Sequence, residues 1–276
     1  MSRILTIAGK EIREGLRNRW IVATTLLLAA LALTLSFLGS APTGTIKAGA
    51  LDVVVVSLSS LTIFLIPLIA LLLAHDAIVG EAERGTLLLL LSYPVARWQV
   101  VLGKFLGHLA ILAFATLVGY GAAAGAMVLQ GQIAGTRSWP AFAAMIGSSV
   151  LLGAVFIAIG YLVSALVRDR GTAAGIAIGI WLLFVLLYDM ALLGLLVLDQ
   201  GRYITAGVLN ALLLLNPADA YRLFNLSGFA NVSLFSGMAG LAKDTTLAAS
   251  VLLGALLAWT VIPLLFASAI FARREL

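Results

Sequence analysis

The chain has 276 residues, of which 62% are hydrophobic and 11% charged, and its mean hydropathy is +1.13. Soluble domains carry about 25% charged residues, so this composition excludes a soluble protein. The apolar runs are continuous and do not alternate with polar residues, which predicts an all-α integral membrane protein and not a membrane β-barrel. The net charge of +5 does not indicate nucleic-acid binding, because the basic residues flank the apolar runs. Cysteine is absent, which excludes disulfides and thiolate metal ligands.

The first predicted element is an amphipathic helix over residues 3–17. At the α-helical period, one arc is apolar and the opposite arc is charged. The apolar arc holds Ile4, Leu5, Ala8, Ile12 and Leu16, and the charged arc holds Arg3, Lys10, Arg13, Glu14 and Arg17. Such a helix lies in the membrane interface with its cations facing anionic lipid.

Six apolar runs follow, each near or above the roughly 20 residues that cross a bilayer. The predicted spans are Trp20–Leu38, Val53–Ala74, Leu102–Leu129, Ala141–Val167, Ala173–Leu198 and Leu247–Phe271. They make residues 1–276 a single transmembrane domain. Six spans put both termini on one side, and most of the 17 basic residues lie on that side. The positive-inside rule therefore predicts cytoplasmic termini.

The most informative connection joins the second and third predicted spans. Residues 81–97 read E-A-E-R-G-T-L-L-L-L-L-S-Y-P-V-A-R. Pro94 lacks an N–H and disfavours helical angles at Tyr93, so we expect one short amphipathic helix over 81–92 that ends before the proline. A helix of this kind at the cytoplasmic surface suits contact with a soluble partner.

The connection between the fifth and sixth predicted spans, residues 199–246, is the largest extracytoplasmic piece. Its apolar run Val208–Leu215 is too short to cross a bilayer and stops at Asn216-Pro217. We expect a re-entrant or interfacial helix, a turn, and a second short helix. This loop either docks a periplasmic protein or packs on the chain's own spans. The residues that would form the docking surface are Asn216, Pro217, Tyr221, Phe224 and Phe229.

Asp189 is the clearest ionisable residue inside a predicted span, and such residues are candidates for function. It either lines a substrate path beside Met190 or bonds a neighbouring helix. Met127, Met145 and Met190 would offer thioether sulfur to a cuprous ion, but methionine in a membrane core is usually filler. No metal ligand set is assigned.

Catalytic motifs are absent from the sequence. Gly103-Lys104-Phe105 lacks the hydroxyl residue of a phosphate-binding G-x-x-x-x-G-K-[ST] loop, and neither H-E-x-x-H nor a nucleophile elbow occurs. The chain is therefore predicted not to be an enzyme and to bind no cofactor of its own.

Glycines four residues apart predict close helix approach. The sets are Gly103/Gly107, Gly121/Gly125 and Gly171/Gly175/Gly179. They serve packing either within one chain or between two copies of it.

The segment Glu81-x-Glu83-Arg84-Gly85-Thr86-Leu87, followed by Pro94-Val95-x-Arg97, resembles the coupling-helix signature of type-2 ABC exporter permeases. In that family the segment joins the second and third of six spans, an amphipathic helix precedes the first, and short outer helices often lie between the fifth and sixth. The resemblance implies a homodimer with one ABC ATPase subunit docked on each coupling helix, and that ATPase would bind ATP and magnesium. It assigns ATPase coupling to Glu81, Glu83, Arg84, Gly85, Thr86, Pro94 and Arg97.

Further stretches resemble a narrower group, the permeases of copper-processing ABC transporters that mature nitrous oxide reductase. These stretches are Ser40–Gly44, His75–Thr86, Leu91–Gln99, Gly103–His108 and Leu215–Asn225. This resemblance implies a multi-pass protein of a bacterial inner membrane that acts in denitrification. Its implied partners are a NosF-like ATPase, a periplasmic NosD-like subunit, a copper-chaperone lipoprotein and nitrous oxide reductase. Copper as cargo rests on the resemblance alone.

Several mechanisms stay open at this point. Either a solute crosses between two protomers, or the permease transmits force from ATP hydrolysis to a periplasmic partner and nothing crosses. The chain could also export another substrate, act as an ion-coupled secondary transporter through Asp189, or serve as a membrane scaffold.

Overall fold

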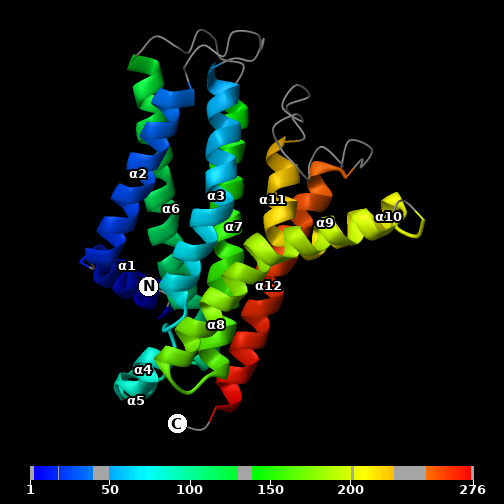
Figure 1. Ribbon diagram of the computed structural model, residues 1–276. Helices are drawn as coiled ribbons and strands as arrows, with labels where there is room; N and C mark the ends of the chain where they lie inside the picture. Colours follow the sequence, from blue (N-terminus) through cyan, green and yellow to red (C-terminus); the bar gives the residue numbers. More distant parts are fainter. Residues whose placement is uncertain are drawn as a thin grey trace.

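The computed structural model describes residues 3–17, 19–39, 50–129, 139–199, 202–226 and 247–274. All regular secondary structure in these ranges is helical, which confirms the predicted class. The long helices form an upright bundle, and both termini lie toward its lower end in Figure 1, called here the terminal end.

The long helices are α2 (Arg19–Gly39), α3 (Ala50–Ala74), α6 (Arg97–Leu129), α7 (Trp139–Leu166) and α12 (Ala249–Arg273). A further rod consists of α8 (Arg170–Leu182), the π-helical turn η1 (Leu183–Leu187) and α9 (Tyr188–Asp199). The shorter helices are α1 (Arg3–Leu16), α4 (Val79–Glu83), α5 (Thr86–Leu91), α10 (Ala206–Leu215) and α11 (Pro217–Leu226).

Within the described ranges, five stretches are long and apolar enough to cross a membrane. They are Val54–Glu83, Arg97–Leu129, Trp139–Leu166, Arg170–Asp199 and Ala249–Arg273, and they correspond to the second to sixth predicted spans. The first predicted span coincides with α2, for which the described apolar stretch is Thr25–Thr34. The count of six therefore stays a prediction.

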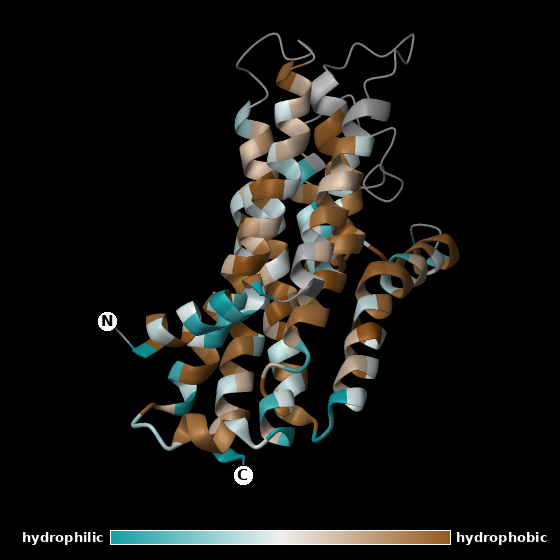
Figure 2. Cartoon of the chain, turned by 90° about the vertical axis from the view of Figure 1, so that its left-hand side faces the viewer, coloured by the Kyte–Doolittle hydropathy of each residue, from teal (hydrophilic) through white to brown (hydrophobic). Residues whose placement is uncertain are grey.

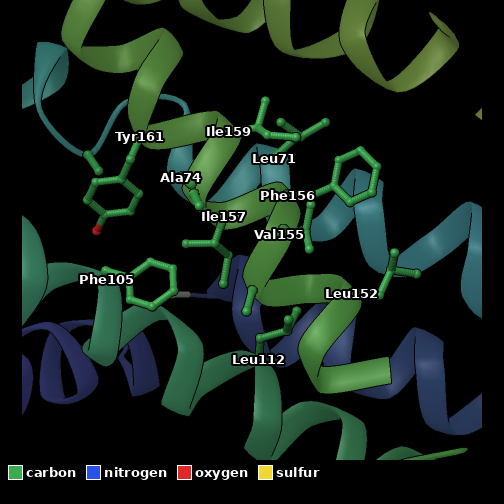
Figure 3. Close-up of a cluster of buried hydrophobic side chains, with 14 of the residues drawn as sticks. Leu71, Ala74, Phe105, Leu112, Leu152, Val155, Phe156, Ile157, Ile159 and Tyr161 are labelled. Carbon is green, nitrogen blue, oxygen red and sulfur yellow. The ribbon is translucent and has the colours of Figure 1, made fainter. Parts of the chain in front are cut away.

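Helix α7 is the centre of the bundle and packs against α3 on one side and α12 on another. Its residues Leu152, Val155 and Phe156 point into the main hydrophobic core (Figure 3). Gly160 lets α3 approach closely, because a Cβ there would lie 2.7 Å from the Cβ of Ala74. Hydrophobic contacts thus surround much of α7, and the other helices pack against it.

Helix α1 lies across the foot of α6, and glycines on α6 make this contact possible. A Cβ on Gly103 would lie 2.8 Å from the Cβ of Ile7, and one on Gly107 would lie 2.5 Å from the Cβ of Glu11. The predicted close approach at this pair is confirmed, and it occurs within one chain. The face of α1 that packs on α6 holds Ile7, Ala8, Glu11 and Gly15.

The buried face of α1 differs from the apolar arc read from the sequence. Leu5 and Leu16 stay more than half exposed, while Glu11 is buried. Because α1 packs on the bundle through a strip that takes only Ala8 from the apolar arc, Leu5 and Leu16 are left facing outward, where a membrane interface would cover them.

Polar residues gather at the terminal end of the bundle, and the middle is predominantly apolar (Figure 2). The rod α8–η1–α9 lies to one side in the same view, and its apolar stretch is the least buried of the five, at 11% against 22% for α12 and 61–67% for the other three.

Candidate functional site

The connection between α3 and α6 forms two short helices and not one. Helix α4 ends at Glu83, Gly85 takes a left-handed conformation with φ = 70°, and α5 begins at Thr86. The expected single helix over 81–92 is wrong in this respect, because a left-handed residue cannot continue a right-handed helix. The hydroxyl of Thr86 donates to the carbonyl of Glu81 at 3.3 Å and bridges the turn. We call residues 79–91 the coupling segment.

The coupling segment has a buried base and an exposed apolar tip. Val79, Gly80 and Glu81 are buried at its base. At the tip, Leu88 is 59% exposed and Leu89 is 68% exposed, and Tyr93, which follows α5, is 67% exposed. Leu87 points inward and anchors the tip to the main core. Neighbouring exposed leucines at the end of a membrane protein are suited to cover by another protein.

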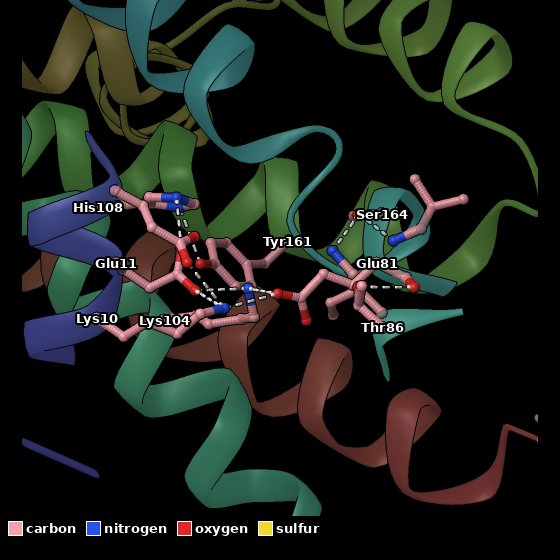
Figure 4. Close-up of polar contacts among 11 residues, drawn as sticks. Lys10, Glu11, Glu81, Thr86, Lys104, His108, Tyr161 and Ser164 are labelled. Atoms are coloured by element: carbon pink, nitrogen blue, oxygen red, sulfur yellow. Dashed lines mark hydrogen bonds and ion pairs between the residues drawn. The ribbon is translucent and has the colours of Figure 1, made fainter. Parts of the chain in front are cut away.

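The base is held by a buried group of charges, drawn in Figure 4. The ammonium of Lys104 on α6 contacts Glu11 of α1 at 2.7 Å and Glu81 of α4 at 2.9 Å. Lys10 contacts Glu81 at 3.4 Å from the exposed side. Three separate elements therefore meet at the ammonium group of Lys104, a residue that is only 3% exposed.

Two more polar side chains extend this group into the bundle. His108 Nε2 lies 3.5 Å from the second carboxylate oxygen of Glu11, and its Nδ1 lies 2.9 Å from the hydroxyl of Tyr161 on α7. We call the six residues the Lys104 cluster; they are Lys10, Glu11, Glu81, Lys104, His108 and Tyr161. Burial lowers the pKa of Lys10, but the carboxylates of Glu81, Glu11 and Glu14 outweigh it and raise that pKa overall.

Helices α7 and α8 hold the same base from the other side. The hydroxyl of Ser164 accepts the backbone N–H groups of Ile78 at 3.0 Å and Val79 at 3.1 Å. Arg170 donates its backbone N–H to Glu83 at 2.8 Å and its guanidinium to Asp76 at 2.8 Å. A displacement of the coupling segment would therefore pull on α1, α6, α7 and α8 together.

The predicted coupling residues fall into two groups. Glu83, Arg84, Gly85, Thr86 and Pro94 are exposed at or near the tip. Glu81 is buried in the Lys104 cluster, and Arg97 binds the end of α12.

Arg97 and Arg274 cap two helix ends. One guanidinium nitrogen of Arg97 lies 2.7–3.1 Å from the carbonyl oxygens of Phe271, Ala272 and Arg274. Arg274 in turn donates to the carbonyls of Ser164, Ala165 and Val167 at the end of α7. The last carbonyls of a helix lack intrahelical donors and carry partial negative charge, so cations there are stabilising.

The residues predicted to line a substrate path lie in two separate places. Asp189 forms an ion pair with Arg222 of α11 at 2.8 Å, as in the helix-bonding alternative. Met190 next to it is 69% exposed. Met127 and Met145 are fully buried in a second core cluster with Tyr120 and Phe142. The described residues hold no group of three or more His, Asp or Glu side chains placed for a metal ion.

The residues predicted for periplasmic docking mostly pack inward. Asn216 and Pro217 are buried at the turn between α10 and α11, and the amide of Asn216 donates to Asp219 at 2.9 Å and to the carbonyl of Phe184 at 3.0 Å. Tyr221 is buried and bonds the hydroxyl of Ser149 on α7 at 2.9 Å. Phe224 packs partly buried against the main core. Phe229 lies outside the described residues.

Asp219, which sequence reasoning did not single out, is the buried centre of the outer helices. It accepts from Arg222 at 2.8 Å, and Arg222 also holds Asp189. Burial raises the pKa of Asp219 to about 7, and the neighbouring Asp189 adds to this, although Arg222 acts in the opposite direction.

The Lys104 cluster was also missed as a unit. Its only signal in the sequence is one lysine placed among apolar residues near the start of α6, where an unpaired charge would be costly. Its two acidic partners come from distant parts of the chain and carry no local signal.

Comparison with known proteins places the chain among membrane transporters. The family model for ABC-2 family transporter proteins matches residues 5–276. A protein of Stutzerimonas stutzeri, described as probable ABC transporter permease protein NosY, is 50% identical over 276 residues and 99% of each chain. A protein of Pseudomonas aeruginosa with the same description is 49% identical over 277 residues and the full length of both chains.

Proposed function

We propose a function on one premise: the chain belongs to the ABC-2 family of transporter proteins and is a NosY-like permease subunit of an ABC transporter. The proposal is that it spans a bacterial inner membrane six times with both termini in the cytoplasm. There it couples ATP hydrolysis by a separate ATPase to copper delivery in the periplasm during nitrous oxide reductase maturation.

The observation that carries this proposal is the coupling segment. Its exposed tip, with Leu88, Leu89 and Tyr93, is the surface on which a NosF-like ATPase would dock. Glu83 and Arg84 beside this tip would give the contact its polar rim. Glu81 and Arg97 would act from inside, by fixing how the segment is presented.

The proposal that copper is the cargo rests on the resemblance and on the two relatives, which are described as NosY permeases. We propose that force, and not a crossing solute, reaches a periplasmic NosD-like subunit. A chain of contacts supports this idea: Arg170 ties α4 to α8, the rod continues through η1 to α9, and Asp189 binds Arg222 of α11. A copper-chaperone lipoprotein and nitrous oxide reductase would complete the system.

A homodimer is the third part of the proposal. Most residues of the rod α8–η1–α9 are exposed and apolar, and a Cβ on Gly175 or Gly179 would meet no described atom within 4 Å. A second copy of the chain would cover this face and use the small residues for close approach.

The proposal is tested by changing both exposed leucines of the tip to aspartate, L88D and L89D. The variant is expected to insert normally but to lose co-purification of the ATPase and maturation of nitrous oxide reductase. Arg13→Glu is the matched control, because it alters an exposed charge at the same end but outside the coupling segment. Normal ATPase capture by the double variant would show that docking occurs elsewhere.

A further inference from the structure

A cavity of about 560 Å³ lies beside the Lys104 cluster, between α1, α3, α6 and the start of α8. It exists because α3 packs mainly on α7, while α6 packs mainly on α1 and α2. These two groups of helices leave a space between them near the terminal end. Of the residues that line this space, Arg84 is the one that also borders the proposed ATPase contact.

The part of the cavity toward the middle of the bundle is apolar. Helix α3 contributes Ile69, Leu72 and Leu73, and α6 contributes Ile111 and Ala115 among others. Ala115 lies seven residues beyond His108 on α6, which is about 10 Å along the helix axis. Leu72 is 42% exposed, so the apolar wall reaches the outer surface of the bundle. The wall therefore suits a hydrocarbon chain that enters from the membrane.

The part of the cavity toward the terminal end is charged and carries both signs. Glu14, Asp76, Arg84 and Arg170 line it, with His75 beside them. Arg170 is already bound to Asp76. The guanidinium of Arg84 makes no hydrogen bond or ion pair with another described residue, and Glu14 contacts only Lys10, at 3.4 Å, within the described ranges. Among the described residues, Arg84 thus offers an unpaired cation to a ligand, and Glu14 offers a carboxylate whose partner, Lys10, is exposed.

We propose that this cavity binds a zwitterionic phospholipid with an ammonium headgroup, such as phosphatidylethanolamine. Arg84 would bind the phosphate, since a guanidinium matches phosphate oxygens well. Glu14 would receive the ammonium, and one acyl chain would lie between α3 and α6. An anionic lipid fits less well, because its headgroup has no cation to offer the carboxylate of Glu14. The bound lipid would fill the gap between the two helix groups.

The test uses the full-length permease purified with its ATPase in detergent and stripped of lipid. Labelled phosphatidylethanolamine and phosphatidylglycerol with the same acyl chains are added separately, and the lipid retained on the complex is measured by native mass spectrometry. The wild type is expected to retain phosphatidylethanolamine about tenfold better, a difference of about 1.4 kcal/mol. Equal retention of the two lipids would overturn the proposal.

Variants test whether the lipid binds in this cavity. The double variant Glu14→Gln with Arg84→Gln changes only exposed side chains and is expected to lose the preference. Leu73→Trp narrows the apolar part without touching a charge and is expected to lower retention of both lipids. Arg168→Gln, which removes an exposed charge between α7 and α8 outside the cavity lining, is the matched control and should behave as the wild type. Unchanged selectivity in the double variant would contradict the assignment.

A soluble competitor separates a lipid from a free phosphate compound. Glycerophosphoethanolamine carries the same headgroup without acyl chains, and it is expected not to displace the lipid. Displacement at a concentration similar to that of the lipid would mean that the site binds a soluble phosphate ester, and the lipid proposal would fail.

Discussion

At the scale of single residues, Lys104 shows how one buried charge can organise the terminal end. Its two acidic partners, Glu11 and Glu81, are buried as well, so each depends on this ammonium for compensation. The sequence indicates that such a lysine needs partners. It does not indicate which ones, because the pairing is set by how α1 and α4 pack against α6.

Lys104→Met is therefore expected to leave two buried carboxylates with only the half-exposed Lys10 as a cationic partner among the lysines described. Breaking a buried ion pair from one side costs about 3–5 kcal/mol, so the midpoint of thermal unfolding in detergent should fall clearly. Lys10→Met, in the same cluster but half exposed, should cost less than about 1 kcal/mol. Adding Glu11→Gln and Glu81→Gln to Lys104→Met should restore much of the loss. Equal effects of the two single lysine variants would contradict the role given to Lys104.

Asp219 gives a prediction about pH at the opposite part of the molecule. Its pKa is raised from 3.8 to about 7, so the folded protein holds this proton more tightly than the unfolded chain. Stability from this group is complete below about pH 4 and is lost as the pH rises to about 7. Thermal unfolding of the wild type should therefore show a decline over this window that Asp219→Asn lacks. A decline of equal size in the variant would assign the effect to other groups.

At the scale of elements, helix existence was more predictable than helix breaks. The long spans could be placed within a few residues, because a run of apolar residues has to be long enough to cross a membrane. The break at Gly85 was missed, since a glycine inside an amphipathic pattern marks a left-handed turn only when packing on both sides demands it. Here Leu87 is buried on one side of the turn and Glu81 on the other.

The cost of a substitution at Gly85 should depend on the backbone conformation and not on the space available to the new side chain. A Cβ at this position meets no atom within 4 Å, so the cost comes from the left-handed angles alone. Gly85→Ala is expected to cost about 1 kcal/mol, or roughly fivefold in ATPase affinity, Gly85→Asn less, and Gly85→Val more. Titration of the membrane-embedded permease with purified ATPase would measure this order. If alanine and valine behaved like asparagine, the left-handed turn would not matter for docking.

At the scale of the whole molecule, the long helices differ in how much of their surface is buried by other helices. Helix α7 is enclosed on most sides, whereas the rod α8–η1–α9 is largely exposed. Hydropathy alone could not reveal this difference in burial, because both stretches are uniformly apolar. An apolar side chain is equally suited to contact with lipid and to contact with another helix. The π-helical turn Leu183–Leu187 also has no simple sequence signal; it frees backbone carbonyls, one of which Asn216 uses.

The exposed rod predicts where two copies meet. Because the chain lacks cysteine, single cysteines can be placed at the exposed α8 positions Ile176, Ile178 and Leu182 without background. Oxidation in membranes is expected to produce disulfide-linked dimers from at least one of them. Cysteines at Phe114 and Leu117, exposed on α6, are the controls and should stay monomeric. Dimers formed through the α6 positions and not through the α8 positions would show that the interface lies on α6.

The two arginine caps at the terminal end set how far the chain can be shortened. Arg97 takes its acceptors from the last turn of α12 and from Arg274, and Arg274 covers the last carbonyls of α7. A truncation that removes Arg274 would leave those carbonyls without donors and deprive Arg97 of one acceptor. Purification tags and fusion partners should accordingly begin after Arg274, because a junction placed earlier would loosen two helix ends and the foot of a third.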